Sequence, residues 1–318
     1  MRPALVAALA SALLAASAGA RNYPSKPVRI VVPFAASGGT DIMARSLALA
    51  MSPALGQPVV VENRPGANGI IGADVVAKAP ADGHTLLLTT NAYTTSPSLY
   101  AKLPYDTERD FSPITLAGSA ANLLAVHPSL PARSVKELIA LARARPGQLT
   151  LSASGAGTPS HLAGELLKQT AKLDILVIQY RGTGASLNDL IGGQVSMTFG
   201  ALPGLAPFVK SSRLRALAVS SPARNAALPE VPALAEMLPG FEVLTWYGLL
   251  APAQTPKSVI ERLHREVVAA LAGSEVRERL AAQGYDPGGM LPEQFAALIR
   301  TDLARWRTVI RAAGIHLE

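Results

Sequence analysis

Four short segments contain residues whose types and spacing could bind a small anion. They are VVPFAASGGTD (31–41), TTNAYTTS (89–96), SASGAGTPSH (152–161) and QYRGTGAS (179–186). Each follows a run of β-forming residues, and the first and third place glycines and small side chains directly before a predicted helix. N–H groups at a helix start lack intrahelical acceptors, and the helix dipole is positive there. Either segment could therefore bind a carboxylate or a phosphate.

Other site types fit these segments poorly. A dinucleotide site needs G-x-G-x-x-G, but the third glycine is replaced by Ser160 in one segment and by Leu187 in another. No Gly-Lys pair is present for a Walker loop, and the five histidines lack metal-ligand spacing. A serine hydrolase that uses Ser154 or Ser160 with His161 stays an alternative, although neither serine lies in G-x-S-x-G.

Several side chains in the segments have two interpretations. His161 could donate to the anion, or it could hold its loop by a hydrogen bond within the first helical turn. Asp41 could charge or cap the helix start at Thr40, or accept a bond from an amine or hydroxyl of the ligand. Three aromatic side chains could line a cleft or pack in the core: Tyr93, Tyr180 and Trp246.

The elements that position these segments alternate between strands and helices. In the first part of the chain, strand patterns at 28–32, 59–61 and 85–89 alternate with helical patterns at 42–55 and around 75–76. Further on, strand patterns at 122–126, 149–152 and 175–179 alternate with helical patterns at 134–144 and 185–191 and with a helix that SASGAGTPSH opens and that continues through Leu162, Glu165 and Leu166. This alternation predicts two α/β domains with largely parallel sheets. Ligands bind beyond the carboxyl ends of such strands, where all four segments lie.

Two further helices are predicted near the C-terminus. One starts at Thr255-Pro256, with proline at the first helical position, and the other at Pro292. Their apolar stripes are Val259, Ile260, Leu263, Val267 and Leu271 in the first, and Phe295, Leu298 or Ile299, Leu303, Trp306 and Ile310 in the second. Helices of this kind usually brace a domain, so we expect Trp306 to be a packing residue.

The first twenty residues, MRPALVAALASALLAASAGA, have the composition of a secretion signal. A basic residue at Arg2 precedes an alanine- and leucine-rich stretch that ends in the small-x-small site Ala18-Gly19-Ala20. The stretch is short and has no basic cluster after it, which disfavours a membrane anchor. We expect cleavage after Ala20 and export to the periplasm.

Composition excludes several classes of chemistry. The absence of cysteine excludes disulfides, thiolate metal sites and cysteine nucleophiles. The formal net charge is +7, or +6 without Arg2, and a positive field concentrates anions. The basic residues are scattered and aromatic residues are few, so nucleic-acid binding is not expected. Solvated helix faces account for most of the charge.

Six segments together resemble a known family. They are PFAASGGTD (33–41), VVVENRPGANGIIGADVVAKAPADGHTLL (59–87), SGAGTPSHLAGE (154–165), YRGTGASLNDLIGGQV (180–195), LRALAVSSPAR (214–224) and TWYGLLAPAQTP (245–256). They resemble the extracytoplasmic solute receptors of tripartite tricarboxylate transporters, the TctC or Bug family. The similarity runs in order through the whole mature chain.

The resemblance implies a type II periplasmic binding protein, with two α/β domains and a ligand cleft between them. By analogy the chain crosses between domains near Ala121–Val126 and Val243–Tyr247. After the signal peptide (1–20), domain 1 would combine 21–122 with 243–318, and domain 2 would comprise 123–242. The resemblance also implies that the first and third segments hold one ligand carboxylate through main-chain N–H groups and bridging waters.

We therefore expect a binding protein without catalytic residues, metal or cofactor. It would close by a hinge motion on an organic acid, a dicarboxylate or an acidic amino acid. The expected ligand contacts are Phe34, Ala35, Ala36, Ser37, Gly38, Gly39, Thr40, Asp41, Asn91, Tyr93, Ser154, Gly155, Ala156, Gly157, Thr158, His161, Tyr180, Gly182, Gly200, Ala201 and Trp246. The family commonly has glycine where this chain has Ser37, and the effect of that serine on the first ligand loop is left open.

We expect the protein to be a monomer that delivers its ligand to the permease subunits of such a transporter. Ligand sensing for a signalling protein is an alternative that would use the same site.

Overall fold

The computed structural model describes residues 23–36, 38–180, 182–312 and 314–315. The predicted signal peptide, its cleavage after Ala20, and Ser37 lie outside the described residues. Within those ranges, no helix is both long enough and apolar enough to span a membrane.

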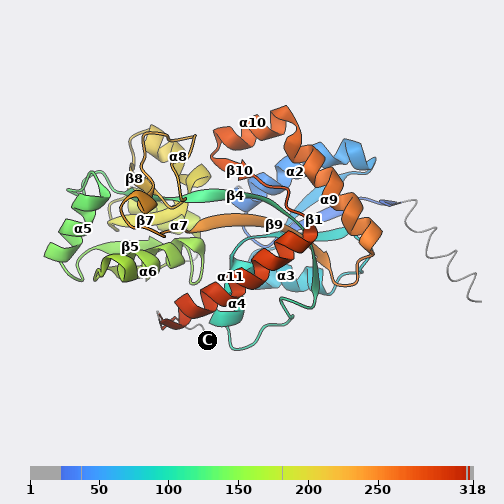
Figure 1. Ribbon diagram of the computed structural model, residues 1–318, viewed down its shortest axis with the longest axis horizontal. Helices are drawn as coiled ribbons and strands as arrows, with labels where there is room; N and C mark the ends of the chain where they lie inside the picture. The colour runs from blue at the N-terminus through green and yellow to red at the C-terminus, as the bar shows by residue number, and fades with distance from the viewer. Residues whose placement is uncertain (1–22, 37, 181, 313, 316–318) are drawn as a thin grey trace, which may run out of the picture.

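One continuous sheet of ten strands forms the centre of the described structure. Its order is β2-β1-β3-β9-β4-β7-β5-β6, with β8 and β10 also paired to β4. The strands are β1 Val28–Val32, β2 Val59–Asn63, β3 Thr85–Thr89, β4 Phe111–Val126, β5 Thr150–Ala153, β6 Leu176–Gln179, β7 Met197–Ala201, β8 Arg215–Val219, β9 Leu244–Pro252 and β10 Tyr285–Pro287. Figure 1 shows β4 and β9 side by side across the middle of the molecule.

The partners of β4 change along its length. Residues 111–121 pair with β9, whereas residues 122–126 pair with β7 and, in part, with β8. Beyond β9, strands β1, β2 and β3 are parallel, and beyond β7, strands β5 and β6 are parallel. The predicted α/β fold with two parallel units is therefore confirmed, and β4 and β9 connect the units.

Helices cover both ends of this sheet. They are α2 Gly39–Leu55, η1 Ala67–Gly69, α3 Ile70–Ala77, α4 Ala92–Leu99, α5 Val135–Ala144, α6 Pro159–Ala171, α7 Thr183–Ile191, α8 Leu202–Lys210, η2 Leu234–Glu236, α9 Lys257–Ala272, α10 Ser274–Ala282 and α11 Pro292–Ala312. In Figure 1, α5 to α8 gather at one end, and α2, α3 and α9 at the other.

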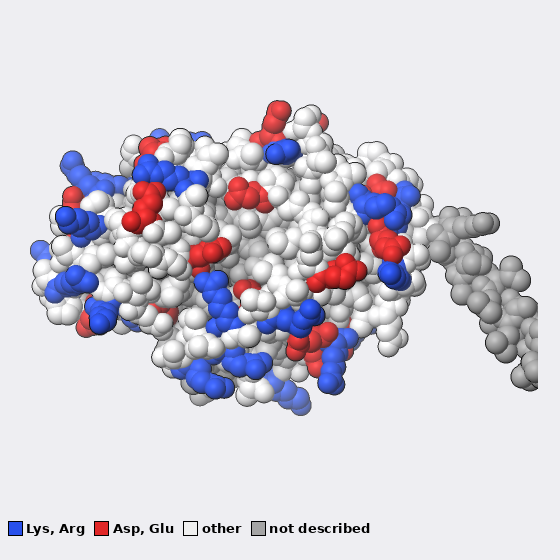
Figure 2. Space-filling view, in the orientation of Figure 1, with Lys and Arg blue, Asp and Glu red and all other residues white. Residues whose placement is uncertain are grey.

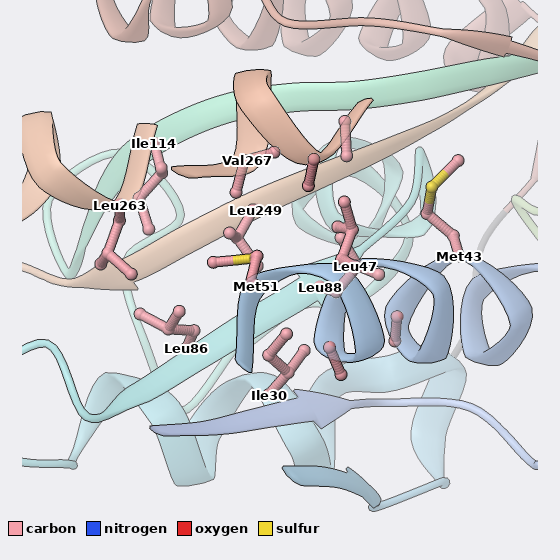
Figure 3. Close-up of a cluster of buried hydrophobic side chains, with 14 of the residues drawn as sticks. Ile30, Met43, Leu47, Met51, Leu86, Leu88, Ile114, Leu249, Leu263 and Val267 are labelled. Atoms are coloured by element: carbon pink, nitrogen blue, oxygen red, sulfur yellow. The ribbon is translucent and has the colours of Figure 1, made fainter. Parts of the chain in front are cut away.

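A buried apolar cluster lies between α2, α9 and the sheet. Figure 3 shows Met43, Leu47 and Met51 of α2 directed toward side chains of the sheet and of α9. The five residues of the predicted α9 stripe are all buried, which confirms that prediction. A second cluster fills the space between α5, α6 and the strands β5 and β7.

Helix α11 contacts both ends of the molecule. Phe295, Ile299 and Leu303 pack in a cluster of the first end, whereas Trp306 and Ile310 pack in the cluster of α5 and α6. The predicted packing role of Trp306 is confirmed, and α11 extends across both units rather than one.

Several element boundaries differ from the sequence predictions. Strand β4 begins at Phe111, well before the predicted strand at 122–126. Its first half contains Pro113 and small residues such as Gly118 and has no run of β-formers, so the sequence pattern did not indicate it. Helix α2 begins at Gly39 rather than at residue 42. Pro256 is the N-cap of α9 and not its first helical residue.

Candidate functional site

The first loop (residues 34–41) leads from β1 into α2 without a side-chain cap. Gly38 is the N-cap, with φ −81° and ψ 169°, and as a glycine it provides no side-chain cap. The first intrahelical bond runs from the Ile42 N–H to the Gly38 carbonyl (3.0 Å), so the N–H groups of Gly39 and Thr40 have no acceptor inside the helix. Ala35, Ala36 and Gly38 are exposed. The chain directly before the positive end of α2 is therefore exposed, although Thr40 and Asp41 in its first turn are buried.

Gly39 is held closely against two tyrosines. The Tyr285 hydroxyl donates to the Gly39 carbonyl at 3.0 Å. A Cβ at residue 39 would lie 2.8 Å from the Tyr247 hydroxyl oxygen and 3.3 Å from that of Tyr285. Since β9 and β10 carry these tyrosines, residues that are distant in sequence fix where α2 begins.

The Asp41 carboxylate is occupied within the protein. It accepts from Arg45 Nε (2.9 Å) and from Asn63 Nδ2 (3.0 Å), and its side chain is buried. Asn63 Nδ2 also donates to the Phe34 carbonyl at 3.1 Å. These contacts favour the interpretation in which Asp41 charges the helix start, at a helix that begins one residue before Thr40.

The second loop (residues 154–158) satisfies its own polar groups. Thr158 is the N-cap of α6, and its hydroxyl accepts from the His161 N–H (3.4 Å) and donates to the Gly155 carbonyl (2.7 Å). His161 Nδ1 accepts from the Gly157 N–H at 3.0 Å. Gly155 and Gly157 have φ values of 147° and 68°, which favour glycine. The Gly157 N–H, which we expected to face the ligand, is therefore used inside the loop.

Helix α4 and the turn η1 of the first unit contact the second loop. A Cβ at Gly157 would lie 2.0 Å from Leu99 Cδ1 and 3.2 Å from Thr95 Oγ1, both on α4. The Ala156 carbonyl accepts from Asn68 Nδ2 at 3.3 Å. These contacts join α4 and η1 to a loop that follows β5.

Asn68, which bonds to the second loop, was not among the residues that the sequence predicted for the site. It has a left-handed φ of 53° and stands between Gly66 (φ 132°) and Gly69 (φ 91°). Asparagine tolerates this conformation better than most residues, so a Gly-Ala-Asn-Gly run after a strand was a usable signal for a tight turn. We refer to residues 66–69 as the Asn68 turn.

The Asn68 turn lies between the two loops. On one side, a Cβ at Gly69 would lie 3.4 Å from Phe34 Cζ in the first loop. On the other side, Asn68 reaches the Ala156 carbonyl of the second loop. The first loop, through Phe34, and the second loop, through Ala156, therefore flank one turn, although more than a hundred residues separate them in sequence.

The segment 179–186 lies beside the second loop. The Tyr180 N–H donates to the Ala153 carbonyl (2.8 Å) and the Gly182 N–H donates to the Ser154 carbonyl (3.1 Å). Gly182 is the N-cap of α7 and provides no side-chain cap. The Tyr180 hydroxyl donates to Asp189 Oδ2 (2.7 Å), a bond that raises the pKa of Tyr180 to about 12. The second loop is thus supported from this side as well.

Three other expected contacts are buried in packing roles. Asn91 Oδ1 accepts from the Trp246 N–H (3.0 Å), and the Trp246 Nε1 donates to Asp302 Oδ2 (2.8 Å) on α11. The Tyr93 hydroxyl donates to the Thr107 carbonyl, and its ring contacts other aromatic rings. Of the two roles that the sequence left open for Tyr93 and Trp246, these contacts favour core packing.

Gly200 and Ala201 end β7 beside the crossover in β4. Ala201 pairs with Asn122, which is 1% exposed. Asn122 Nδ2 donates to the Val243 carbonyl (2.8 Å), and Thr245 Oγ1 donates to Asn122 Oδ1 (3.0 Å). Buried side-chain hydrogen bonds therefore tie β4 and β9 together where β4 changes partners.

In the described structure, neither Ser154 nor Ser160 forms a hydrogen bond with His161. Ser154 Oγ donates to Thr158 Oγ1 (3.3 Å), and Ser160 Oγ is buried with no hydrogen-bond partner among the described residues. His161 Nδ1 is occupied by a main-chain N–H. In the described ranges, no cluster of three or more His, Asp or Glu side chains could hold a metal ion.

Surface features give no competing site in the described structure. In Figure 2 the Lys and Arg side chains are spread over the visible face and stand among Asp and Glu side chains. One cavity of about 390 Å³ is lined by residues at the start of α5 and around η2. Another, of about 400 Å³, lies between α2, α9 and α10. None of the four segments lines either cavity.

The sequence matches one family over most of its length. The family model described as "Tripartite tricarboxylate transporter family receptor" matches residues 43–315. A UPF0065 protein from the tcbD-tcbE intergenic region of Pseudomonas sp. (strain P51) is 40% identical over 314 residues, which cover 97% of this chain and 94% of that protein.

Solved structures of similar sequence have the same fold. Rpa4515 of R. palustris, solved with adipate, has a TM-score of 0.88 at 36% identity, and the match covers 93% of this chain and all of that one. The periplasmic binding protein BugD gives 0.85 at 36% identity with the same coverage. MatC of Rhodopseudomonas palustris, solved with bound malate, gives 0.82 at 32% identity, covering 91% of this chain and 100% of that one.

Proposed function

This chain belongs to the tripartite tricarboxylate transporter receptor family, and on that premise we propose that it captures a small carboxylate in the periplasm and delivers it to a membrane permease. The family consists of periplasmic solute-binding receptors and not of enzymes. Ligand binding without bond cleavage is therefore the activity to be explained.

One observation carries the proposal. The first loop, which leads into α2 with a glycine N-cap, and the second loop flank the same turn, through the contacts of Gly69 with Phe34 and of Asn68 with Ala156. Unsatisfied N–H groups at a helix start attract negative charge and donate to carboxylate oxygens. We infer that a carboxylate bound at the start of α2 lies near the second loop, where contacts with both units become possible.

The ligand class follows from the chemistry of these donors and from two relatives. Rpa4515 was solved with adipate and MatC with malate, and both ligands are small dicarboxylates. For this chain we propose that one carboxylate binds at residues 35–40 and contacts the second loop and Asn68. Gly182, Gly200 and Ala201 are candidates for distal contacts. We leave Asn91, Tyr93 and Trp246 out of the proposed set because their polar groups have partners in the core.

Hinge closure would occur where β4 and β9 connect the two units. We keep the proposed boundaries, with 21–122 and 243–318 in one domain and 123–242 in the other, since β4 changes partners between Ala121 and Asn122. The bond between Asn68 and Ala156 links these proposed domains directly, as a contact of a closed state would. Cleavage of the signal peptide after Ala20 remains part of the same proposal.

Calorimetric titration tests the binding role. Purified mature protein is titrated with malate, adipate, succinate, glutamate and acetate, and the ligand is recovered and analysed afterwards. We expect saturable binding of at least one dicarboxylate near one equivalent, with the ligand unchanged. Binding of none of them, or conversion of any of them to product, would contradict the proposal.

The delivery role needs a separate genetic test. Deletion of the gene should abolish uptake of the bound carboxylate, measured with radiolabelled ligand. Normal uptake with a lost transcriptional response to the ligand would favour the sensing role instead.

A further inference from the structure

His161 is a buried side chain whose ring accepts a main-chain hydrogen bond. It is 4% exposed, and its Nδ1 lies 3.0 Å from the Gly157 nitrogen, which donates to it. An imidazole nitrogen accepts a hydrogen bond only when it carries no proton. The geometry therefore requires a neutral ring with its proton on Nε2.

The accepted bond determines the shape of the second loop. Gly157 has a φ of 68°, and its Cα is packed so closely on α4 that a Cβ would overlap Leu99. The neighbouring carbonyl of Ala156 is directed to Asn68. An acceptor at the position of Nδ1 thus holds the turn at the point where the loop meets the other unit.

Among the described residues, the charged groups that shift the pKa of the ring are Glu165 and Lys168, both on its own helix. Glu165 Oε1 is 3.9 Å from Nε2, and Lys168 Nζ is 3.0 Å from the same carboxylate oxygen. The strands that pack against α6, namely β4, β5, β6 and β7, contain no titratable residue, and α11 reaches this core through Trp306 and Ile310. A proton added to the ring would meet little compensating charge beyond Glu165.

Resting on the proposed carboxylate site, we propose that His161 is a positioning residue, which acts through the Gly157 N–H and holds the second loop in its binding conformation only while the ring is neutral. Protonation of Nδ1 replaces an acceptor by a donor that faces another donor, so the turn at Gly157 must rearrange. Burial lowers the pKa of His161, with Glu165 opposing and Lys168 adding to that shift, so the neutral form persists into mildly acidic solution. Carboxylate affinity should fall in more acidic solution for this reason.

Two substitutions separate the accepted bond from the rest of the side chain. In His161→Asn the amide oxygen can still accept from Gly157 but cannot be protonated, whereas His161→Ala has no acceptor. With adipate as the calorimetric probe at pH 7.5, we expect affinity to fall on the order of tenfold in His161→Ala and to stay within about threefold in His161→Asn. If adipate does not bind, malate is used in the same way.

The pH dependence of carboxylate affinity distinguishes the proposed role from a merely structural one, which would not change that dependence. Between pH 7.5 and pH 5, the affinity of the wild type should fall more than that of His161→Asn, because protonation of the ligand is common to both proteins. Parallel profiles would overturn the proposal.

The tautomer is checked on the unaltered protein, so the test does not depend on a folded variant. Nitrogen-15 NMR of the wild-type imidazole at pH 7.5 should show an unprotonated Nδ1 and a protonated Nε2. A proton on Nδ1 would overturn the proposal.

The outcomes also separate this inference from the proposed function. Failure of the wild type to bind any dicarboxylate at pH 7.5 contradicts the function itself. Wild-type binding that His161→Ala leaves unchanged, with a folded variant, contradicts only the positioning role.

Discussion

The two helix starts that follow β1 and β5 look alike in sequence but differ in what their N–H groups do. Before α2, Gly38 provides no side-chain acceptor, and Ala35, Ala36 and Gly38 are exposed. Before α6, Thr158 and His161 accept the N–H groups of their own loop. Small residues and glycines next to a helix therefore produce either an open anion site or a self-satisfied turn, and the side chains at the N-cap and in the first turn decide which.

This difference suggests a division of roles in the proposed site. The start of α2 would supply the electrostatic attraction, because its first N–H groups have no intrahelical acceptor. The second loop would supply shape, because its conformation is held by Thr158, His161 and Asn68. Changes to the first loop should thus affect binding more than folding, and changes to the second should affect both.

The largest effect is expected for a methyl group added to the second loop. Gly157→Ala combines a left-handed φ with a Cβ that would overlap Leu99, so the free energy of unfolding should fall by roughly 2–4 kcal/mol. The matched change in the first loop, Gly38→Ala, has an ordinary φ and an open contact of 3.5 Å, and should cost no more than about 1 kcal/mol. Urea denaturation of both variants measures this. Equal costs would remove the distinction between the loops.

Next in size is a cap added to the first loop. Gly38→Asp places a carboxylate at the N-cap of α2, where it should raise the free energy of unfolding by up to about 1 kcal/mol. The same carboxylate competes with the ligand and repels it, so the affinity for adipate or malate should fall at least about tenfold. Calorimetry and urea denaturation are run together, with Gly38→Ala as the uncharged control. Retained affinity in Gly38→Asp would argue against α2 as the carboxylate site.

A smaller effect is expected when the existing cap of α6 is removed. Thr158→Ala loses the acceptor for the His161 N–H and the donor to the Gly155 carbonyl, which should cost about 1 kcal/mol. Thr158→Ser keeps the hydroxyl and should lie within a few tenths of a kcal/mol of the wild type. Thermal unfolding of the pair is the measurement. If both variants lose the same stability, the methyl group and not the hydroxyl holds the loop.

The smallest effect is a pH dependence that belongs to the second loop alone. The pKa of His161 is lowered in the folded chain, so below about pH 6.5 the unfolded chain takes up this proton more readily. The free energy of unfolding of the wild type, relative to His161→Asn, should therefore fall as pH falls through that value and level off once the folded chain is also protonated. Urea denaturation from pH 8 to pH 5 measures it. A relative stability that rises toward acid pH would contradict the assigned shift.

Local patterns predicted much of the fold. The bounds of β1 and β3 agree with the sequence, since each is a short run of strand-forming residues between turn residues. Ser134 caps α5 by accepting from the Glu137 N–H (3.2 Å), and a serine followed three residues later by a glutamate is the spacing typical of such a cap. The apolar stripes of α9 and α11 are buried as predicted. The helical period is enough to identify such a face from the sequence.

The candidate site was predicted less completely. The first and second loops were identified from their glycines, but the internal use of the Gly157 N–H depended on the orientation of one ring, His161. Tyr93 and Trp246 could not be assigned to core or cleft, because an aromatic residue near a strand end has the same local pattern in either role. For Asn68 the sequence indicated only a tight turn. It did not indicate that the side chain bonds to the Ala156 carbonyl.

By itself the sequence determined what depends on near neighbours: the order of strands and helices, the caps available to each helix, and the two loops able to offer N–H groups. The tertiary structure alone decided that Asn68 meets Ala156, that Gly39 lies against Tyr247 and that Trp246 binds Asp302. Each of those pairs is separated by many residues and meets only because β4, β9 and α11 bring distant parts of the chain together. Hydrophobic periodicity specifies which face of an element is buried, but it does not specify which residue lies opposite.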